Sequence, residues 1–159
     1  MDPQLIIGLL LSVLPVFEIR GGLPLIVDYA LREGISIWPY FFMALTLNIL
    51  VIFLIFLFLD FLHESFMNLR TYRHVIGKVL KRVHKKAEKV EKKFEKLEYI
   101  SLFLFVSIPL PGSGAWSGAL ISWILGLDRK KSFVAIALGV AISGLLVLLL
   151  SLGFFNWFY

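Results

Sequence analysis

Glu18 and Arg20 are the residues of this sequence whose types and spacing could do chemistry in an apolar setting. They place a carboxyl group and a guanidinium group two positions apart, directly after 15 uncharged residues, Pro3 to Phe17. An ionisable side chain inside a membrane costs about 2.5–3.5 kcal/mol on insertion scales, and it marks a substrate or ion pathway by default. Residues i and i+2 do not face each other on a helix. We therefore expect either a non-helical backbone or separate partners, such as Asn48 or a carbonyl group of a hairpin tip.

Two roles are open for this pair. We hypothesise that Arg20 holds an anionic headgroup and that Glu18 is a carboxylate that couples transport to protons. The alternative is a buried clamp that ties one hairpin tip to another and takes no part in turnover. Asn48 likewise contacts either a neighbouring helix or the substrate. The candidate binding residues that follow Arg20 in this half are Gly21, Gly22 and Pro24.

A second candidate site lies where prolines and glycines interrupt 28 uncharged residues, Ile100 to Leu127. Proline removes a backbone donor and glycine lowers helix propensity, so the chain should break at bilayer depth. Such a break must be buried in protein or line a wet cavity. A helix that restarts there offers free N–H groups that suit phosphate or carboxylate, while the glycines alternatively serve only to pack the tips. The candidate residues are Pro109, Pro111, Gly112, Ser113, Gly114, Trp116, Ser117 and Gly118.

Other kinds of site find little support in the sequence. The chain has no cysteine, and its 3 histidines lie in one basic segment without metal-ligand spacing, so we expect no metal and no cofactor. Neither a phosphate-binding loop with a lysine nor a nucleophile–base pair nor paired catalytic carboxylates can be recognised. We therefore do not expect an enzyme.

The composition indicates an integral membrane protein. Of the 159 residues 59% are hydrophobic, against about half in soluble domains, and the mean hydropathy is +0.88. The formal charge of +5 is concentrated between His63 and Tyr99, where 11 Lys or Arg stand against 5 Glu. The positive-inside rule places this basic loop in the cytoplasm of a multi-pass protein of the cell membrane, and it accounts for the charge without nucleic acid.

Segment lengths predict which parts cross the membrane. Residues 38–59 form an uncharged run of about 33 Å as a helix, enough to span a core of about 30 Å, and a second span begins at Ser132. The arms on either side of Glu18–Pro24 are too short to span, as are residues 100–108 and 115–127. Each pair of arms is therefore expected to enter the membrane and return, with tips at Glu18–Pro24 and at the Pro/Gly break.

These predictions combine into one architecture. We predict an all-α integral membrane protein, built as an inverted repeat of two re-entrant helical hairpins, each followed by a transmembrane helix. Residues 1–62 and 100–159 form the two units of one membrane domain. Residues 63–99 form a basic amphipathic cytoplasmic helix, whose apolar seam could pair with another chain, pack on the membrane domain or lie on anionic headgroups.

The motifs also resemble a known family. Glu18-Ile19-Arg20-Gly21-Gly22-Leu23-Pro24, a basic central loop and Pro109-Leu110-Pro111-Gly112-Ser113-Gly114-Ala115-Trp116-Ser117-Gly118 are similar, over nearly the whole chain, to the small multidrug export family. That family is more distantly similar to the DedA-like (VTT-type) membrane proteins. The latter resemblance implies two opposed re-entrant hairpins and the movement of lipids, including polyprenyl-phosphate carriers.

The function predicted from these features is membrane transport. We expect an amphiphilic, anionic lipid-type substrate, coupling to protons, contact with membrane lipids and a homodimer, because so short a chain encloses little cavity by itself. One alternative is efflux of small cationic drugs, with Glu18 as the binding charge. The other is a non-transporting scaffold whose basic helix recruits partners or anionic lipid.

Overall fold

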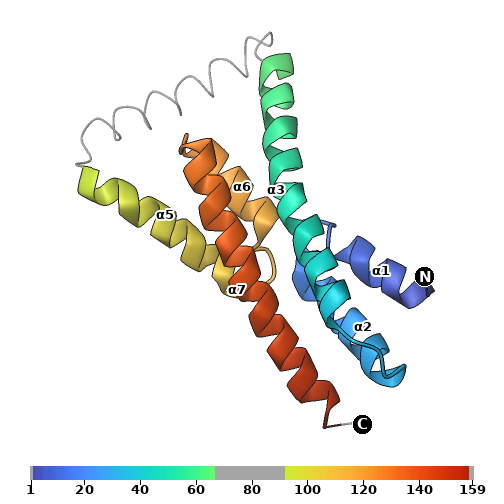
Figure 1. Cartoon of the computed structure of the whole chain (residues 1–159). Coiled ribbons are helices and arrows are strands. Elements are labelled where there is room, and N and C mark those ends of the chain that lie inside the picture. The colour runs from blue at the N-terminus through green and yellow to red at the C-terminus, as the bar shows by residue number, and fades with distance from the viewer. Residues whose placement is uncertain (1, 67–91, 158–159) are drawn as a thin grey trace.

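A computed structural model of the chain describes residues 2–66 and 92–157 (Figure 1). The regular structure within these residues is helical. The helices are α1 (Pro3–Leu11), α2 (Glu18–Arg32), α3 (Trp38–Phe66), α5 (Lys92–Ser107), α6 (Ala115–Ile124) and α7 (Arg129–Phe155). Most of the basic segment predicted as an amphipathic helix, residues 67–91, lies outside the described residues.

Two of the described helices, α3 and α7, are long and apolar enough to cross a membrane. The apolar stretches are Trp38–Leu62 and Arg129–Phe155, each with a hydropathy of 2.8. They contain the segments predicted as spans, so the prediction of two long apolar helices is confirmed. Asp60, near the end of α3, pairs with Arg129 at the start of α7. The two helices run in opposite directions (Figure 1).

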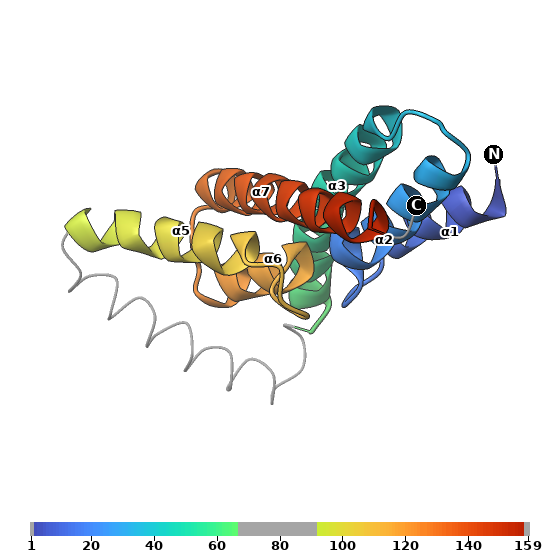
Figure 2. The same cartoon turned by 90° about the horizontal axis from the view of Figure 1, so that it is seen from below.

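The shorter helices form two pairs, each with its own connecting tip. Residues 12–17, the first tip, join α1 to α2, and residues 108–114, the second tip, join α5 to α6. Figures 1 and 2 place α1 and α2 at one end of the molecule and α5 at the other, with α7 between them. Helix α7 packs against both α2 and α5, while α3 packs against α6. Trp116, just after the second tip, donates to the carbonyl oxygen of Val13 in the first tip, so the two tips lie close to each other.

The first tip does not lie where the sequence predicted it. Glu18–Pro24, the predicted tip, forms the first two turns of α2, and Pro24 lies inside that helix. The break occurs earlier, at Pro15 and Val16, whose φ of 77° is left-handed. Gly22 allows α2 to pack closely on α1 and does not form a turn of the chain, because a Cβ atom there would overlap the carbonyl oxygen of Gly8 on α1.

The second break lies in the predicted segment. Helix α5 ends at Ser107 and α6 begins at Ala115, so Pro109, Pro111, Gly112 and Gly114 interrupt the apolar run as expected. Helix α5 begins at Lys92 and continues without interruption past Tyr99, the last residue of the basic segment. Its arm of the second pair is therefore longer than the nine residues that the sequence indicated.

Candidate functional site

Glu18 acts as the missing N-cap of α6. Helix α6 begins after Gly114, which has no side chain to bond the first N–H groups of the helix. The Glu18 side chain, with only 4% of its residue surface exposed, fills that place: its Oε1 accepts a hydrogen bond from the backbone N–H of Trp116 at 3.0 Å. A carboxylate at a helix N-terminus satisfies a free donor and meets the positive end of the helix dipole.

The local backbone around Glu18 is shaped for this contact. A Cβ atom on Gly114 would overlap the Glu18 carboxylate, so the residue before α6 has to be glycine for the carboxylate to enter. Glu18 itself has a φ of 50°, in the left-handed region. A non-glycine residue there costs about 1–3 kcal/mol and persists only when its surroundings hold it, as the bond to Trp116 does here.

Arg20 makes the complementary contact at the end of α5. Its Nη2 atom donates to the carbonyl oxygens of Val106, at 2.8 Å, and Ser113, at 3.3 Å. Its Nη1 atom donates to the carbonyl oxygen of Leu110 and to the hydroxyl of Ser113, the latter at 2.9 Å, and its Nε donates to the hydroxyl of Ser143 on α7 at 3.0 Å. The guanidinium group thus supplies donors to carbonyls that the broken helix leaves free, at the negative end of the α5 dipole.

The two charges therefore lie on either side of the same break. Glu18 meets the positive terminus of α6, and Arg20 meets the negative terminus of α5. The sequence left open either a non-helical backbone or separate partners for Glu18 and Arg20. In the structure the two side chains have separate partners, and the partners of Arg20 include carbonyl groups of the second tip. The first half of the chain thus supplies both charges that the break in the second half requires.

The first tip is held by bonds from two other helices. Asn48 on α3 is 1% exposed, and its amide nitrogen donates to the carbonyl oxygen of Ser12 at 2.6 Å. The indole Nε1 of Trp116 donates to the carbonyl oxygen of Val13 at 3.0 Å. Asn48 thus contacts a neighbouring helix end and neither Glu18 nor Arg20. Its Oδ1 is buried without a hydrogen-bond partner among the described residues.

The remaining predicted residues of the first half are packed against neighbouring residues. Gly21 lies against the side chain of Phe17, Gly22 lies against Gly8 and Ser12, and Pro24 is half-buried within α2. None of these three is among the residues that bond to the second tip in the described structure. Gly22 brings α2 close to α1 and so helps to fix the place from which Glu18 and Arg20 extend.

The second half divides between the site and its surroundings. Ser113, Gly114 and Trp116 contact Glu18 or Arg20 as described, and Ser117 is half-buried in the first turn of α6. Pro109 is half-buried, while Pro111 and Gly112 are exposed, and the φ of 80° at Gly112 marks a left-handed turn. Gly118 packs against Val106 and Ile136, so it brings α6 close to its neighbours.

Ser143 and Ser12 belong to the site although the sequence did not single them out for it. Ser143 is fully buried and accepts the bond from Arg20 Nε. Gly139 and Ser143 are four residues apart, a spacing typical of a small-residue face for close helix contact, and Gly139 does lie against Val106 and Phe103. A serine in the middle of an apolar helix was the one available signal, because its hydroxyl needs a partner there.

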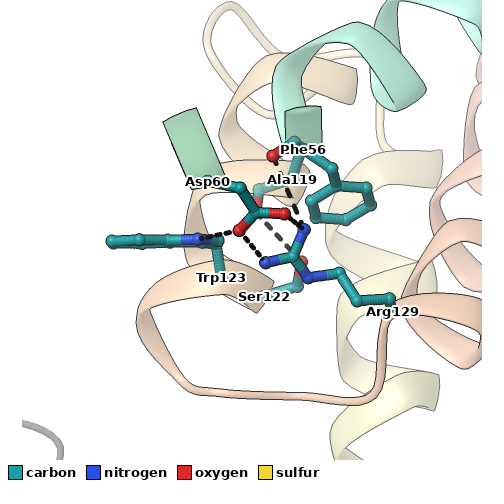
Figure 3. A network of polar contacts seen from close by, with 6 residues as sticks. All are labelled: Phe56, Asp60, Ala119, Ser122, Trp123 and Arg129. Atoms are coloured by element: carbon teal, nitrogen blue, oxygen red, sulfur yellow. Dashed lines mark hydrogen bonds and ion pairs between the residues drawn. The ribbon is translucent and has the colours of Figure 1, made fainter. Parts of the chain in front are cut away.

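A second polar cluster joins the C-terminal part of α3 to the N-terminal end of α7 (Figure 3). The guanidinium group of Arg129 pairs with the carboxylate of Asp60, with Nη1 and Oδ2 2.5 Å apart, and lies 5.2 Å from the centre of the Phe56 ring. The indole of Trp123 donates to Asp60 Oδ1 at 3.4 Å. The cluster therefore ties α3, α6 and α7 together at one end.

Two grooves open on the surface beside α5. One, of about 620 Å³, runs between α5 and α7, and the other, of about 500 Å³, runs between α5 and α6. Both are lined mainly by apolar side chains. Glu18 and Arg20 line neither of them.

The comparisons with known proteins give one match. The family described as "Putative small multi-drug export protein" matches residues 18–146, more than half of the chain. The matched range begins at Glu18, directly after the first tip, and contains Glu18, Arg20 and the whole second tip. No curated protein and no solved structure matches the chain.

Proposed function

Because this chain belongs to the small multi-drug export protein family, we propose that it is a membrane transporter that moves an anionic, lipid-type amphiphile and couples this movement to protons through Glu18. The contact between Glu18 and the N-terminus of α6 carries the proposal. Protonation would remove the negative charge that this terminus attracts. Proton binding would thereby weaken the link between the start of α2 and the start of α6, and allow the neighbouring tips to separate.

We propose that the two helix pairs are re-entrant hairpins related by inversion. At about 1.5 Å per residue, the 9 residues of α1 and the 10 residues of α6 are about 14 and 15 Å long, half of a membrane core of about 30 Å. Helix α2 leads directly into the start of α3, whereas α6 leads into the start of α7, and α3 and α7 run in opposite directions. The first pair would therefore open toward one side of the membrane and the second toward the other.

The hydrogen bonds of Arg20 suggest how an anionic substrate and the protein would compete for the same N–H donors. Its guanidinium group donates to three carbonyl oxygens and two hydroxyls in this conformation. A phosphate or carboxylate headgroup accepts the same donors, and it adds the attraction of opposite charges and the option of two parallel bonds. We propose that an anionic headgroup reaches Arg20 only after the tips separate, replacing Leu110 and Ser113.

A cationic drug is the alternative substrate, with Glu18 as its binding charge. Gly114 and Trp116 enclose the Glu18 carboxylate in this conformation, so either substrate would need the tips to separate. The several donors that Arg20 would then offer favour the anion. The third alternative, a scaffold, depends on a basic segment that lies largely outside the described residues. We retain the homodimer as part of the proposal, because a chain of 159 residues encloses little cavity alone.

Reconstitution in liposomes tests the proposal. Flux of a fluorescent anionic lipid and uptake of a cationic dye are compared for the wild type, Glu18→Gln and Glu33→Gln, a matched change at an exposed residue beyond α2. We expect the wild type and Glu33→Gln to move the lipid, and Glu18→Gln to fold but lose the flux. Unchanged lipid flux in Glu18→Gln would refute the role of Glu18. Dye uptake without lipid flux would indicate that the substrate is a cationic drug and not an anionic lipid.

A further inference from the structure

Trp116 bonds the start of α6 to both ends of the first tip, residues 12–17. Its backbone N–H donates to Oε1 of Glu18, which follows the tip directly, and its indole Nε1 donates to the carbonyl oxygen of Val13, near the beginning of the tip. Both donor–acceptor distances are 3.0 Å. One residue of α6 therefore holds the first tip at both of its ends.

The geometry of a helix start explains how one residue reaches both acceptors. The first N–H groups of a helix have no partner within the helix, so the N–H of Trp116 is free to meet the Glu18 carboxylate. Side chains on a helix lean toward its N-terminus, so the half-buried indole of Trp116 extends back toward the tips. The two bonds thus begin on the same turn of α6, and a movement of that turn changes both of them.

The two bonds respond differently to protons. The backbone N–H of Trp116 bonds to a carboxylate, and hydrogen bonds with an ionised partner are about twice as strong as neutral ones. Proton uptake by Glu18 would remove this advantage together with the attraction of the helix dipole. The indole bond joins two neutral groups and does not depend on pH by itself. It therefore adds a constant free energy to the joined tips, which proton binding has to overcome.

Arg20 is the charged group that accompanies Glu18 at this place, and an arginine keeps its proton throughout. Helices α1 and α6 contain no charged residue. On the other helices, the charged residues among the described side chains lie about 12 Å or more along the helix from Arg20 or from the residue that bonds to a tip or to Arg20. They are Asp28 and Arg32 on α2, Asp60 on α3, Glu98 on α5, and Arg129, Lys130 and Lys131 on α7. Glu18 is therefore the group whose titration acts on Trp116.

We propose that Trp116 is a positioning residue that couples proton uptake by Glu18 to separation of the two tips, and that its indole bond to Val13 sets the pH at which they separate. The inference rests on the proposed function, since it deepens the role given to Glu18. Without the indole bond, less proton binding is needed to separate the tips. The transition should then move to higher pH.

The pH profile of lipid flux in liposomes tests this role, with equal pH on both sides of the membrane. Wild type, Trp116→Phe and Trp123→Phe are compared from about pH 4 to about pH 9, the range in which perturbed carboxyl groups titrate. Phenylalanine keeps an aromatic ring and the backbone N–H but has no indole donor. A neutral hydrogen bond contributes about as much free energy as a shift of one pKa unit, so we expect the midpoint of Trp116→Phe about 0.5–1 pH unit higher.

Trp123→Phe is the matched control, because it makes the same change further along α6. Its midpoint should equal that of the wild type. Lower flux at an unchanged midpoint in Trp116→Phe would mean that the indole only stabilises the fold, and it would overturn the proposal. So would an equal shift of the midpoint in both variants.

Fluorescence of Trp116 gives a readout that does not depend on transport. The chain has 4 tryptophans, so replacing Trp38, Trp123 and Trp157 by phenylalanine leaves Trp116 as the single fluorophore. In nanodiscs containing lipids brominated in the acyl chain, separation of the tips should expose the indole, so quenching should increase as the pH falls. The same protein with Glu18→Gln should be quenched equally at every pH. Quenching that is independent of pH in both proteins, or that changes equally in both, would overturn the proposal.

The two measurements also distinguish this inference from the proposed function. Quenching that depends on pH and on Glu18, in a protein that moves no lipid, would keep the coupling through Trp116 and refute transport. Lipid flux together with quenching that does not change with pH would keep transport and refute the coupling.

Discussion

Glu18 caps a helix to which it does not belong: its Oε1 accepts the backbone N–H of Trp116 at 3.0 Å, across 98 positions of sequence. Two residues later, Arg20 donates to the carbonyl oxygen of Val106 at the end of the helix before the same break. Together they bond to free backbone groups at both helix ends, the end of α5 and the start of α6, that the Pro/Gly segment creates. This explains why a carboxylate and a guanidinium group stand so close in sequence without facing each other.

The first prediction concerns the space at Gly114. In Gly114→Ala the new methyl group would occupy the place of the Glu18 carboxylate, which would have to leave the N–H of Trp116. We expect a loss of about 1–3 kcal/mol in the free energy of unfolding, the range for a buried polar group that loses its partner. Denaturant titration of the purified protein in detergent micelles measures this loss.

A double-mutant cycle identifies the cause. In a Glu18→Ala background the methyl group at position 114 has room, so the added cost of Gly114→Ala should fall to about 0.5 kcal/mol or less. Gly153→Ala is the matched control, because nothing lies within 4 Å of a Cβ atom at that position of α7. Equal costs of Gly114→Ala with and without the Glu18 carboxylate would exclude the proposed contact.

The sequence predicted this site in part. The cost of charge in an apolar segment and the need to bury a broken helix were enough to select Glu18, Arg20, Ser113, Gly114 and Trp116. They did not reveal that the glycine makes room for a carboxylate, since this depends on the distance between two segments 96 positions apart. The first tip was predicted too late in the chain, at Glu18–Pro24, because charges, glycines and a proline gather there. Helix α2 nevertheless accommodates Pro24, and the chain breaks earlier, at Pro15 and Val16.

The second prediction concerns the geometry of Arg20. Lysine keeps the charge but has one compact ammonium group, which cannot reach Val106, Leu110 and Ser143 at once. Arg20→Lys should therefore lower the free energy of unfolding by about 2 kcal/mol, through acceptors left without a donor. Arg32→Lys, at an exposed side chain, should change it by less than about 1 kcal/mol. Similar small effects for both variants would mean that only the charge of Arg20 matters.

Ser143 illustrates what periodicity alone misses. The spacing of Gly139 and Ser143 correctly indicated a face for close packing on α7, since Gly139 lies against α5. It could not identify Ser143 as the acceptor for Arg20, because small-residue patterns do not specify which neighbour brings a donor. The long spans were the easiest to predict, because their hydropathy depends on composition and length alone.

The third prediction compares the exposed ion pair of Asp60 and Arg129 with the buried contact between Glu18 and the backbone of Trp116. The side chains of Asp60 and Arg129 are 48% and 44% exposed, so screening by solvent should limit the value of their pairing. Asp60→Asn keeps an acceptor for Trp123 and should cost less than about 1 kcal/mol in the same titration. A cost above about 2 kcal/mol would show that this cluster is as shielded from solvent as Glu18 is.

The account as a whole depends on hairpins that enter from opposite sides of the membrane. Ser36, between α2 and α3, and Lys130, at the start of α7, are both exposed, and the natural chain has no cysteine to interfere with labelling. Single-cysteine variants Ser36→Cys and Lys130→Cys are treated with a membrane-impermeant maleimide in intact cells. The account predicts that Ser36→Cys reacts at once and that Lys130→Cys reacts only after permeabilisation. Labelling of both variants from the same side would contradict it.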